Sequence, residues 1–504
     1  NGVTTRFYRD GDKYMVRTDD EDGKLTDFEV AYVFGVYPLQ QYLLPLSRGR
    51  LQALSIAWDS RPASAGGQRW YHLYPDEPID HQDPLHWTGP YQNWNTRCAE
   101  CHSTDLQKNY DRQTRSFDTQ YAEIDVACEA CHGPGERHLA LAEADKLGSV
   151  RAGGFATELA QRGLWSFPEG ESIARRSESL QSRAQIDSCG RCHSRRGNLG
   201  DYHYGADLLD THRLSLPQSP LYHYDGQILD EVYVYGSFVQ SKMHQAGVVC
   251  SNCHEPHSNN LRAPGNGVCA QCHKPATYDT PEHHFHPTQS SGASCANCHM
   301  PETTYMVVDP RRDHSMRVPR PDLSVMMGTP NACTQCHDDK TDQWALDALR
   351  ERGVGFRDTG SHPARSFAAF DQGDARAITR LSQLANDESA APVWRATAME
   401  ALGQAGGGEA TQTMAALHYH DESIIRSSTV RSLQFLSLPQ RFQLLTPLID
   451  DPVLAVRIEV ATSLAAVPLY QIDPNQDEQL RGLFNEYLAV QEQHSYMPGV
   501  LMQL

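Results

Sequence analysis

The alternation of apolar and polar residues divides the chain of 504 residues into three stretches. In the first stretch the alternation has a period of two and forms short runs at residues 6–17, 28–34, 51–58 and 70–74. An Asp10-Gly11 turn interrupts the first run, and a Glu21-Asp22-Gly23 turn precedes the second. Such runs, separated by turns that contain glycine, are typical of antiparallel strands. We therefore expect residues 1–75 to form a small β-rich cap.

A helical period replaces this pattern from about Trp344 onward. Arg395, Arg426 and Arg457 occupy equivalent positions in three amphipathic segments, and successive arginines are 31 residues apart. A second amphipathic segment precedes each of them, at residues 375–384, 411–417 and 442–448. Helix pairs that stack at a fixed period form an α-solenoid. We therefore expect residues 341–504 to form a HEAT-like repeat domain that docks other proteins, and a plain helical bundle covering the middle of the chain is the alternative.

The middle stretch, residues 76–340, sustains neither period, but it contains all 14 cysteines of the chain. They form seven pairs with the spacing Cys-x-x-Cys, and a histidine directly follows every pair. The seven motifs are Cys98, Cys101 and His102; Cys128, Cys131 and His132; Cys189, Cys192 and His193; Cys250, Cys253 and His254; Cys269, Cys272 and His273; Cys295, Cys298 and His299; and Cys333, Cys336 and His337.

Cys-x-x-Cys-His is the attachment sequence of c-type haem. Each of the two thiols adds to one vinyl group of the same porphyrin, and the following histidine becomes the proximal ligand of the iron. We therefore predict seven c-type haems, with the seven motif histidines as proximal ligands. Because a porphyrin is a large apolar surface, haems would replace side chains in the core of this stretch. We expect short helices, long connections and little regular sheet there.

Two other uses of Cys-x-x-Cys fit the sequence less well. A zinc ribbon needs two such pairs for one metal and no following histidine, so seven pairs would leave one unmatched. A thioredoxin-like dithiol needs its own strand and helix, and this stretch has no room for seven of them.

Each haem iron has one further axial position, and its occupant sets the reduction potential or leaves the iron open to a substrate. The chain has 24 histidines, so the seven proximal ligands leave 17. We expect most irons to take a second histidine, chosen by proximity to the motifs. The candidates are His86, His138, His212, His244, His257, His284, His286 and His314, and we expect one ligand from the cluster of His283, His284 and His286. Less favoured are His72, His81, His203, His223, Met243, Met300 and Met316.

Charge and hydropathy restrict the partners and the location. A net charge of −19 argues against nucleic acid, whose phosphates attract basic surfaces. Redox proteins with a basic face, extracellular acceptors and further copies of the chain remain as partners. No run of 18 apolar residues is present, so no transmembrane segment is expected. The first residues contain neither the charged nor the apolar region of a signal peptide, so we expect a mature or trimmed chain. Because bacteria attach haem to thiols outside the cytoplasm, we expect a periplasmic or extracellular protein.

Five segments together look like parts of a known family. They are residues 83–89, with Asp-Pro-Leu-His-Trp-Thr-Gly, 93–102, 128–135, 236–243 and 330–333. They resemble bacterial multihaem c-type cytochromes of the cytochrome c-554 and hydroxylamine oxidoreductase-like type, which carry C-terminal helical repeats, often tetratricopeptide repeats. The resemblance covers about residues 1–340 and implies periplasmic or extracellular electron transfer. From the motifs and the composition we expect residues 76–340 to form a mostly α-helical and irregular heptahaem domain. The resemblance also implies that a haem segment before Asn1 and repeats after Leu504 are missing from this chain.

These observations predict an electron-transfer protein that passes single electrons between redox partners through closely spaced, mostly bis-histidine haems. One alternative is a multihaem oxidoreductase for nitrite, hydroxylamine or a sulfur oxyanion, in which one iron has an open position. A second alternative is a subunit of a polymeric cytochrome filament. The sequence does not decide whether the protein is an enzyme, and it identifies no catalytic residue.

Overall fold

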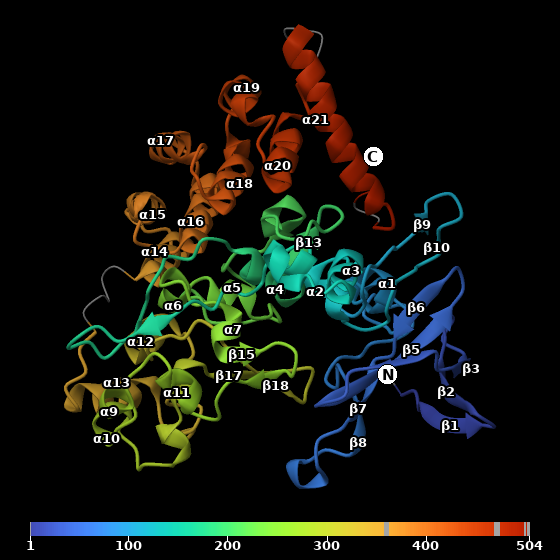
Figure 1. Ribbon diagram of the computed structural model, residues 1–504, viewed down its shortest axis with the longest axis horizontal. Coiled ribbons are helices and arrows are strands. Elements are labelled where there is room, and N and C mark those ends of the chain that lie inside the picture. Colours follow the sequence, from blue (N-terminus) through green and yellow to red (C-terminus); the bar gives the residue numbers. More distant parts are fainter. Residues whose placement is uncertain (1, 357–361, 468–473, 498–499, 501–504) are drawn as a thin grey trace. The chain divides into compact units, whose positions relative to one another are not determined.

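The computed structural model describes residues 2–356, 362–467, 474–497 and 500 (Figure 1). The chain folds into two compact units. The first unit comprises Asn1–Asp145, Thr304–Arg311 and Gln493–Leu504, and the second comprises Lys146–Thr303 and Arg312–Glu492. The first two Cys-x-x-Cys-His motifs lie in the first unit and the other five lie in the second. The division at residues 75 and 340 stays a prediction.

Antiparallel strands begin the first unit, as the sequence predicts. β1 (Arg6–Asp10), β2 (Lys13–Asp19) and β3 (Leu25–Glu29) form one sheet in that order. The second sheet has the order β4-β5-β7-β8, with β6 also paired to β5. Its strands are β4 (Tyr32–Phe34), β5 (Leu39–Leu46), β6 (Arg50–Ala53), β7 (Ile56–Asp59) and β8 (Arg69–His72). The sequence does not predict β5, because Pro38 directly before it and Pro45 within it interrupt the alternation of apolar and polar residues.

β5 places buried side chains on both faces of the second sheet, and one face holds the first motif. Leu44 of β5 packs in an apolar cluster with Trp87, whereas its neighbour Leu43 packs in another cluster with Trp94 and Ala99. Successive side chains of a strand point to opposite faces, which explains the two clusters. Because Ala99 lies between the two cysteines of the first motif, the sheet fixes the position of that motif.

Short helices and two-stranded ribbons make up most of the motif region, as expected. The helices are α1 (Trp94–Arg97), α2 (Cys128–His132), α3 (Glu136–Glu143), α4 (Ala184–His193), α5 (Tyr235–Phe238), α6 (Lys242–Gln245), α7 (Cys250–Cys253), α8 (Gly267–Ala270), α9 (Pro275–Tyr278), α10 (Pro281–His284), α11 (Cys295–His299) and α12 (Pro321–Met327). The ribbons pair β9 (Tyr110–Asp111) with β10 (Ser116–Phe117), β11 (Trp165–Ser166) with β12 (Arg175–Arg176), β13 (Arg196–Asn198) with β14 (His212–Leu214), β15 (His254–Glu255) with β16 (Asn260–Leu261), and β17 (Glu302–Tyr305) with β18 (Asp309–Arg312).

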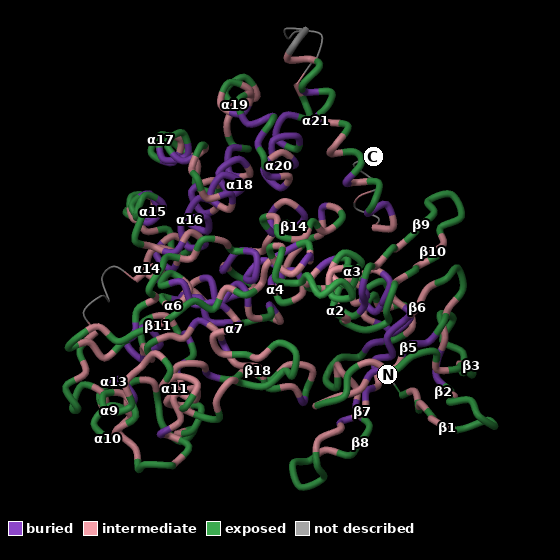
Figure 2. The backbone as a smooth tube through the Cα atoms, viewed as in Figure 1, coloured by how far each residue is buried: buried purple, intermediate pink, exposed green. Residues whose placement is uncertain are grey.

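Longer helices follow the last motif. They are α13 (Asp342–Glu351), α14 (Pro363–Asp371), α15 (Ala377–Asn386), α16 (Pro392–Ala405), α17 (Gly408–Leu417), α18 (Ser423–Ser432), α19 (Leu438–Leu445), α20 (Leu454–Leu464) and α21 (Pro474–Gln493). α16 packs against α18, and α18 packs against α20, and Figure 2 shows buried residues along all three. The helices that contain the repeated arginines are therefore neighbours in space.

The repeated arginines bind the segment that precedes their own helix. Arg395 Nε donates to the carbonyl of Ala385 at 2.9 Å, and Arg426 Nη1 donates to the carbonyl of Asp421 at 2.9 Å. Arg457 Nη1 donates to the carbonyl of Asp451 at 2.6 Å. Each arginine thus ties its helix to the turn or helix end before it, which explains why the residue recurs with the helix pair.

The helices and the motif region share one apolar core. Ile186 and Val249, which lie beside the third and fourth motifs, belong to the same buried cluster as Trp394 and Met399 of α16. The helical part of the second unit is therefore packed directly on the part that carries the motifs. No helix among the described residues is long and apolar enough to cross a membrane.

Candidate functional site

Turns of helix present the motif residues. α2, α7 and α11 begin at the first cysteine of a motif, and α4 ends at His193. The backbone N–H of His273 donates to the carbonyl of Cys269 at 2.9 Å, and that of His337 donates to the carbonyl of Cys333 at 2.9 Å. Residues three and four positions apart share one face of a helical turn. The two cysteines of a motif and its histidine are therefore grouped on one side of the backbone.

The thiols form neither disulfides nor a zinc site. All 14 cysteines are free. Across the described ranges, no three side chains of His, Cys, Asp or Glu converge in a way that could hold a metal ion. A structural zinc site needs four such ligands. Each motif therefore keeps its own pair of thiols and its own histidine.

Consecutive motifs of the second unit lie near each other in sequence order. The thiol of Cys189 in the third motif hydrogen-bonds to that of Cys250 in the fourth, and Cys269 in the fifth motif does the same with Cys295 in the sixth. Cys253 of the fourth motif and Cys272 of the fifth lie close enough for their charges to interact. The same holds for Cys298 of the sixth motif and Cys336 of the seventh. The five motifs thus form one continuous series.

A threonine links the two motifs of the first unit. Thr104 lies two residues after His102, and its Oγ1 donates to the carbonyl of Asp125 at 2.8 Å. The same Oγ1 accepts from the backbone N–H of Ala127 at 2.9 Å. Because Ala127 directly precedes Cys128, this hydroxyl holds the end of the first motif against the start of the second.

Three motif histidines face a second imidazole. The ring centres of His254 and His314 are 6.3 Å apart, with 24° between the ring planes. The corresponding values are 6.2 Å and 15° for His299 and His283, and 6.1 Å and 30° for His337 and His286. These are the motif histidines of the fourth, sixth and seventh motifs. The same arrangement recurs with nearly the same spacing at all three.

The spacing of these pairs fits a metal ion between the rings. A histidine nitrogen binds a metal at about 2 Å, and the ring centre lies about 1 Å beyond the nitrogen, so two axial imidazoles have ring centres about 6 Å apart. The residues present therefore fit the predicted haem iron at these three motifs.

Hydrogen bonds at Nδ1 orient several of these rings. Nδ1 of His299 lies 2.7 Å from the carbonyl oxygen of Arg317, and Nδ1 of His314 lies 2.9 Å from that of Arg312. Nδ1 of His286 bonds to the carbonyl oxygen of His284. Since a carbonyl only accepts, Nδ1 carries the proton and Nε2 keeps its lone pair. Histidines that bind metals usually donate their other N–H in this way.

Burial keeps the nearby histidines uncharged. It lowers the pKa of His273 and of His314, and it lowers the pKa of His244 to about 4. A histidine must be neutral to bind a metal. These three side chains are therefore in the required protonation state at neutral pH.

Large apolar side chains lie exposed beside the motifs. Ile173 pairs with His273 in a β-bridge and is 46% exposed, and Leu261 pairs with His254 and is 49% exposed. Val126, two residues before Cys128, is 49% exposed. An exposed apolar side chain gains stability when another apolar surface covers it. A porphyrin attached to the adjacent thiols would supply such a surface.

The structure argues against the predicted ligand role of His86. This side chain is buried, and its Nε2 lies 3.2 Å from Oδ2 of Asp19 while its Nδ1 lies 2.8 Å from Oγ1 of Thr88. Both ring nitrogens are therefore used inside the β-rich part. His72, the weaker candidate nearby, accepts a hydrogen bond at Nδ1 from the backbone N–H of Tyr74 at 3.0 Å.

The histidine cluster at residues 283–286 faces two motifs instead of the one expected. His283 and His286 lie against His299 and His337, but His284 does not lie against either. His284 accepts a hydrogen bond at Nδ1 from the backbone N–H of His286 at 3.2 Å, which places its ring proton on Nε2. His283, which is not among the candidates favoured from the sequence, is therefore the residue that faces His299, and the ligand roles of His283 and His284 stay predictions. Proximity to a motif is equal for both residues and could not separate them.

The other candidates occupy varied positions. His138 lies on α3 and is half-buried, and His257 is exposed, with Nδ1 3.2 Å from Oε1 of Glu255. His212 begins β14 and is fully buried, with Nδ1 2.9 Å from Oγ1 of Thr211. His244 lies on α6. The roles of these four histidines stay predictions. Met243 and Met316 pack against the main apolar core.

The motif histidines of the first and fifth motifs have other ring neighbours. Phe34 of β4 lies with its ring centre 5.6 Å from that of His102, at 65° between the planes. Tyr278 lies 5.4 Å from His273, at 88°. Among the described residues, neither of these two histidines is stacked on a second imidazole in the way seen at the fourth, sixth and seventh motifs.

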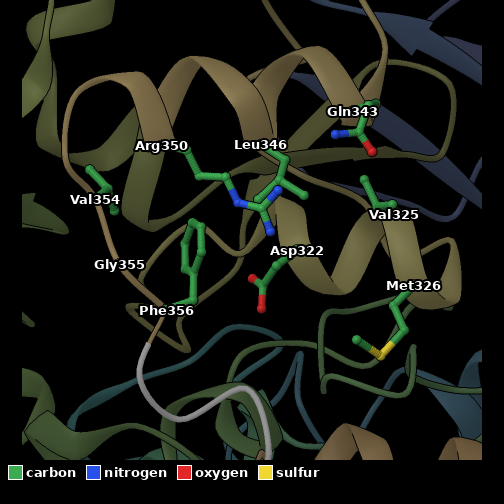
Figure 3. Close-up of a pocket in the computed structure, with 9 residues that line it drawn as sticks. All are labelled: Asp322, Val325, Met326, Gln343, Leu346, Arg350, Val354, Gly355 and Phe356. Atoms are coloured by element: carbon green, nitrogen blue, oxygen red, sulfur yellow. The ribbon is translucent and has the colours of Figure 1, made fainter.

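A cavity of about 600 Å³ lies between α12 and α13 (Figure 3). Its lining includes Asp322, Met326, Leu346, Arg350 and Phe356, and it contains no cysteine or histidine. Oδ1 and Oδ2 of Asp322 already bind the guanidinium of Arg320. The cavity therefore offers no thiol and no axial ligand for a haem.

Comparison with known proteins supports a c-type cytochrome. Residues 78–133, which hold the first two motifs, match the family Cytochrome c554 and c-prime. No curated protein sequence matches the chain significantly. Among solved structures, the outer cell wall cytochrome OcwA is similar with a TM-score of 0.41 and 17% sequence identity, over 79% of this chain and 85% of that chain. Similarity at this level supports no conclusion about binding or activity.

Proposed function

We propose that the chain is a multihaem c-type cytochrome that carries electrons between redox partners. Each of the seven Cys-x-x-Cys-His motifs would hold one haem through its two thiols, and its histidine would bind the iron. A haem iron takes up and releases one electron without changing its ligands. The family match at the first two motifs and the same motif at five further places support this assignment.

The observation that carries the proposal is the closeness of consecutive motifs. Cys189 lies within hydrogen-bonding range of Cys250, and Cys269 within that of Cys295; thiols of the fourth and fifth motifs, and of the sixth and seventh, are close enough for their charges to interact. Porphyrins attached to neighbouring thiols would lie close to one another. We infer a path for electrons that follows the sequence order from the third motif to the seventh. The protein contributes by fixing this spacing and by keeping the iron ligands neutral and oriented.

We assign the second axial ligands of three irons to the facing histidines. His314 would bind the iron of the fourth motif, His283 that of the sixth and His286 that of the seventh. Two histidine ligands close the iron to other molecules and give low-potential, low-spin centres. Such centres suit electron transfer, because nothing but the electron needs to enter or leave.

The helical part of the second unit is proposed to serve as a docking platform. Its helix pairs recur with the arginine spacing of 31 residues and pack on the motif region through one core. HEAT-like stacks usually bind other proteins. We also propose a periplasmic or extracellular location, because bacteria attach c-type haem outside the cytoplasm. If copies of the chain assembled through the helical repeats, the protein would be the filament subunit of the second alternative.

One observation favours an oxidoreductase as a second candidate. The ring of His273, in the fifth motif, has Tyr278 as its neighbour and is not stacked on another imidazole in the described part of the chain. An iron held by His273 alone would have an open position for a nitrogen or sulfur oxyanion or for hydroxylamine. Electron paramagnetic resonance separates the two candidates: a high-spin ferric signal that shifts with nitrite or hydroxylamine favours the enzyme, and exclusively low-spin irons exclude it.

The test of the proposal uses the full chain matured in a host that attaches c-type haem. Mass spectrometry should show seven added haems. In Cys250→Ala with Cys253→Ala the count should fall to six, and stopped-flow transfer from a reductant to an external acceptor should slow, because the series is broken in the middle. The matched control, Cys128→Ala with Cys131→Ala, removes a haem from the first unit. Chain without attached haem, or unchanged transfer in the first variant, would overturn the proposal.

A further inference from the structure

A buried cluster of charges lies beside two of the imidazole pairs. Nη1 of Arg317 is 3.3 Å from Oδ2 of Asp225, and Nη2 of Arg317 is 3.8 Å from Oδ2 of Asp313. The two carboxylates are each 2% exposed, and the guanidinium is 14% exposed. Two carboxylates and one guanidinium leave one net negative charge. Buried charges are screened weakly, so this charge acts on its surroundings over a longer distance than one on the surface.

The segment that carries the cluster is bonded to the sixth motif. The backbone N–H of Arg317 donates to the carbonyl of His299 at 3.0 Å, and the carbonyl of Arg317 accepts from His299 Nδ1 at 2.7 Å. The backbone N–H of Asp313 donates to the carbonyl of Pro301 at 2.9 Å. Movement of Arg317 would therefore move the hydrogen bond that orients the His299 ring.

The same segment carries the imidazole that faces the fourth motif. His314 lies directly after Asp313, and its Nδ1 donates to the carbonyl of Arg312 at 2.9 Å. Its ring faces that of His254 at 6.3 Å. Residues 312–317 thus hold the proposed distal ligand of one iron and the hydrogen-bond acceptor for the proximal ligand of another. These two irons belong to motifs that are separated in the series by the fifth.

Other hydrogen bonds fix the carboxylates of the cluster. Oδ1 of Asp313 accepts from the backbone N–H of Ser315 at 2.7 Å. Oδ2 of Asp225 accepts from Gln227 Nε2 at 2.8 Å, and the carbonyl of Asp225 accepts from Arg317 Nη1 at 3.1 Å. The cluster therefore joins the turn at Asp225 to the segment 312–317.

We propose that the Asp225–Arg317–Asp313 cluster sets the reduction potentials of the fourth and sixth haems together. This inference rests on the proposed function. A net negative charge stabilises ferric iron over ferrous iron and so lowers a potential, and hydrogen bonds to axial ligands are a second control on the same quantity. Because one segment serves both irons, a change in the cluster acts on both. Arg317 is a positioning residue, and its own side chain binds no iron.

The test is a redox titration followed by electron paramagnetic resonance on the full haem-loaded protein. Asp313→Asn removes one negative charge and should raise the potentials of the fourth and sixth haems. Arg317→Gln removes the positive charge and should lower both. Asp225→Asn, farther from the ligands in sequence, should repeat the first result if Asp313→Asn fails to fold. Signals that disappear in His314→Gly and His283→Gly identify the two haems.

Arg320→Gln is the matched control. Arg320 is as buried as Arg317, with 9% of its side chain exposed, and pairs with Asp322 at 2.7 Å. Its carbonyl accepts from the backbone N–H groups of Leu323 and Ser324 and not from a histidine. In this variant the potentials of the fourth and sixth haems should stay unchanged or shift by unequal amounts. The inference is wrong if both variants keep intact low-spin haems but Asp313→Asn does not raise the potentials of the fourth and sixth haems, or Arg317→Gln does not lower both. If the protein lacks low-spin haem altogether, the proposed function itself fails.

Discussion

His283 and His299 face each other with their ring centres 6.2 Å apart and their planes 15° from parallel. We predict that His283→Gly opens the iron of the sixth motif, because glycine offers no side chain to replace the imidazole. One low-spin ferric signal should be lost from the electron paramagnetic resonance spectrum and one high-spin signal should appear. Added imidazole should reverse the change by filling the open position.

The adjacent residue provides the control for this prediction. His284 lies on the same helix, but its Nδ1 accepts from the backbone N–H of His286 and its ring does not face a motif histidine. His284→Gly should therefore leave every low-spin signal in place. An equal loss in both variants would mean that the helix unfolded, and no loss in His283→Gly would remove the assignment.

Tyr278 stands between His273 of the fifth motif and His283, which faces the sixth. Its ring lies 5.4 Å from that of His273 and 5.4 Å from that of His283, nearly perpendicular to each, and its hydroxyl is 3.1 Å from Oγ of Ser172. We predict that Tyr278→Leu loosens the His283 ring, so that cyanide displaces it about tenfold more readily, as is usual when the support of a ligating histidine is removed. Tyr278→Phe keeps both ring contacts and should bind cyanide like the wild type. Equal cyanide affinities in all three proteins would contradict this role.

The sequence predicts which residues form the motifs far better than it predicts which distant residues contact them. The grouping of two cysteines and a histidine in each motif follows from local spacing, because a helical turn alone brings Cys, Cys and His together. Second ligands depend on contacts between distant segments. His86 illustrates this point: its neighbour Asp19 is 67 residues away on β2, and proximity to Cys98 gave no sign that this pair would form.

The repeated arginines are an intermediate case. Their period of 31 residues is readable in the sequence and predicts neighbouring helices, and α16, α18 and α20 do pack in that order. The shared core of Ile186 and Met399 was not predictable, since both segments have ordinary apolar patterns. Patterns fix which face of a helix is buried, but they do not identify the surface that covers it.

The third prediction concerns pH. Asp187 lies on α4, two residues before Cys189, and burial raises its pKa to about 7. The carboxyl group is therefore neutral below about pH 7 and negative above it. A negative charge stabilises ferric iron, so the potential of the third haem should fall as the pH rises through 7. Asp187→Asn stays neutral and should give a potential that does not change over this range.

Potentiometric titration between pH 5.5 and about 8.5, around the raised pKa, measures this dependence. Asp201, which is exposed and lies in the same part of the second unit, gives the control Asp201→Asn. That variant should retain the slope of the wild type. A third haem whose potential is flat with pH in the wild type, or which keeps its slope in Asp187→Asn, would show that another group is responsible.

The last prediction tests the helical repeat. Nε and Nη2 of Arg426 bind Oδ2 and Oδ1 of Asp451 at 2.8 and 3.0 Å, and both side chains are buried. Arg426→Ala leaves the carboxylate buried without its partner, which costs about 3–5 kcal/mol. The melting temperature, measured by circular dichroism, should fall by about 10 °C. In Arg376→Ala, where the guanidinium is 77% exposed beside Asp374, the change should stay within about 0.5 kcal/mol. Because α18 packs against both α16 and α20, Arg426→Ala should also lower the melting temperature of the core around Ile186. Equal stability of the two variants would show that the repeat does not depend on its arginines.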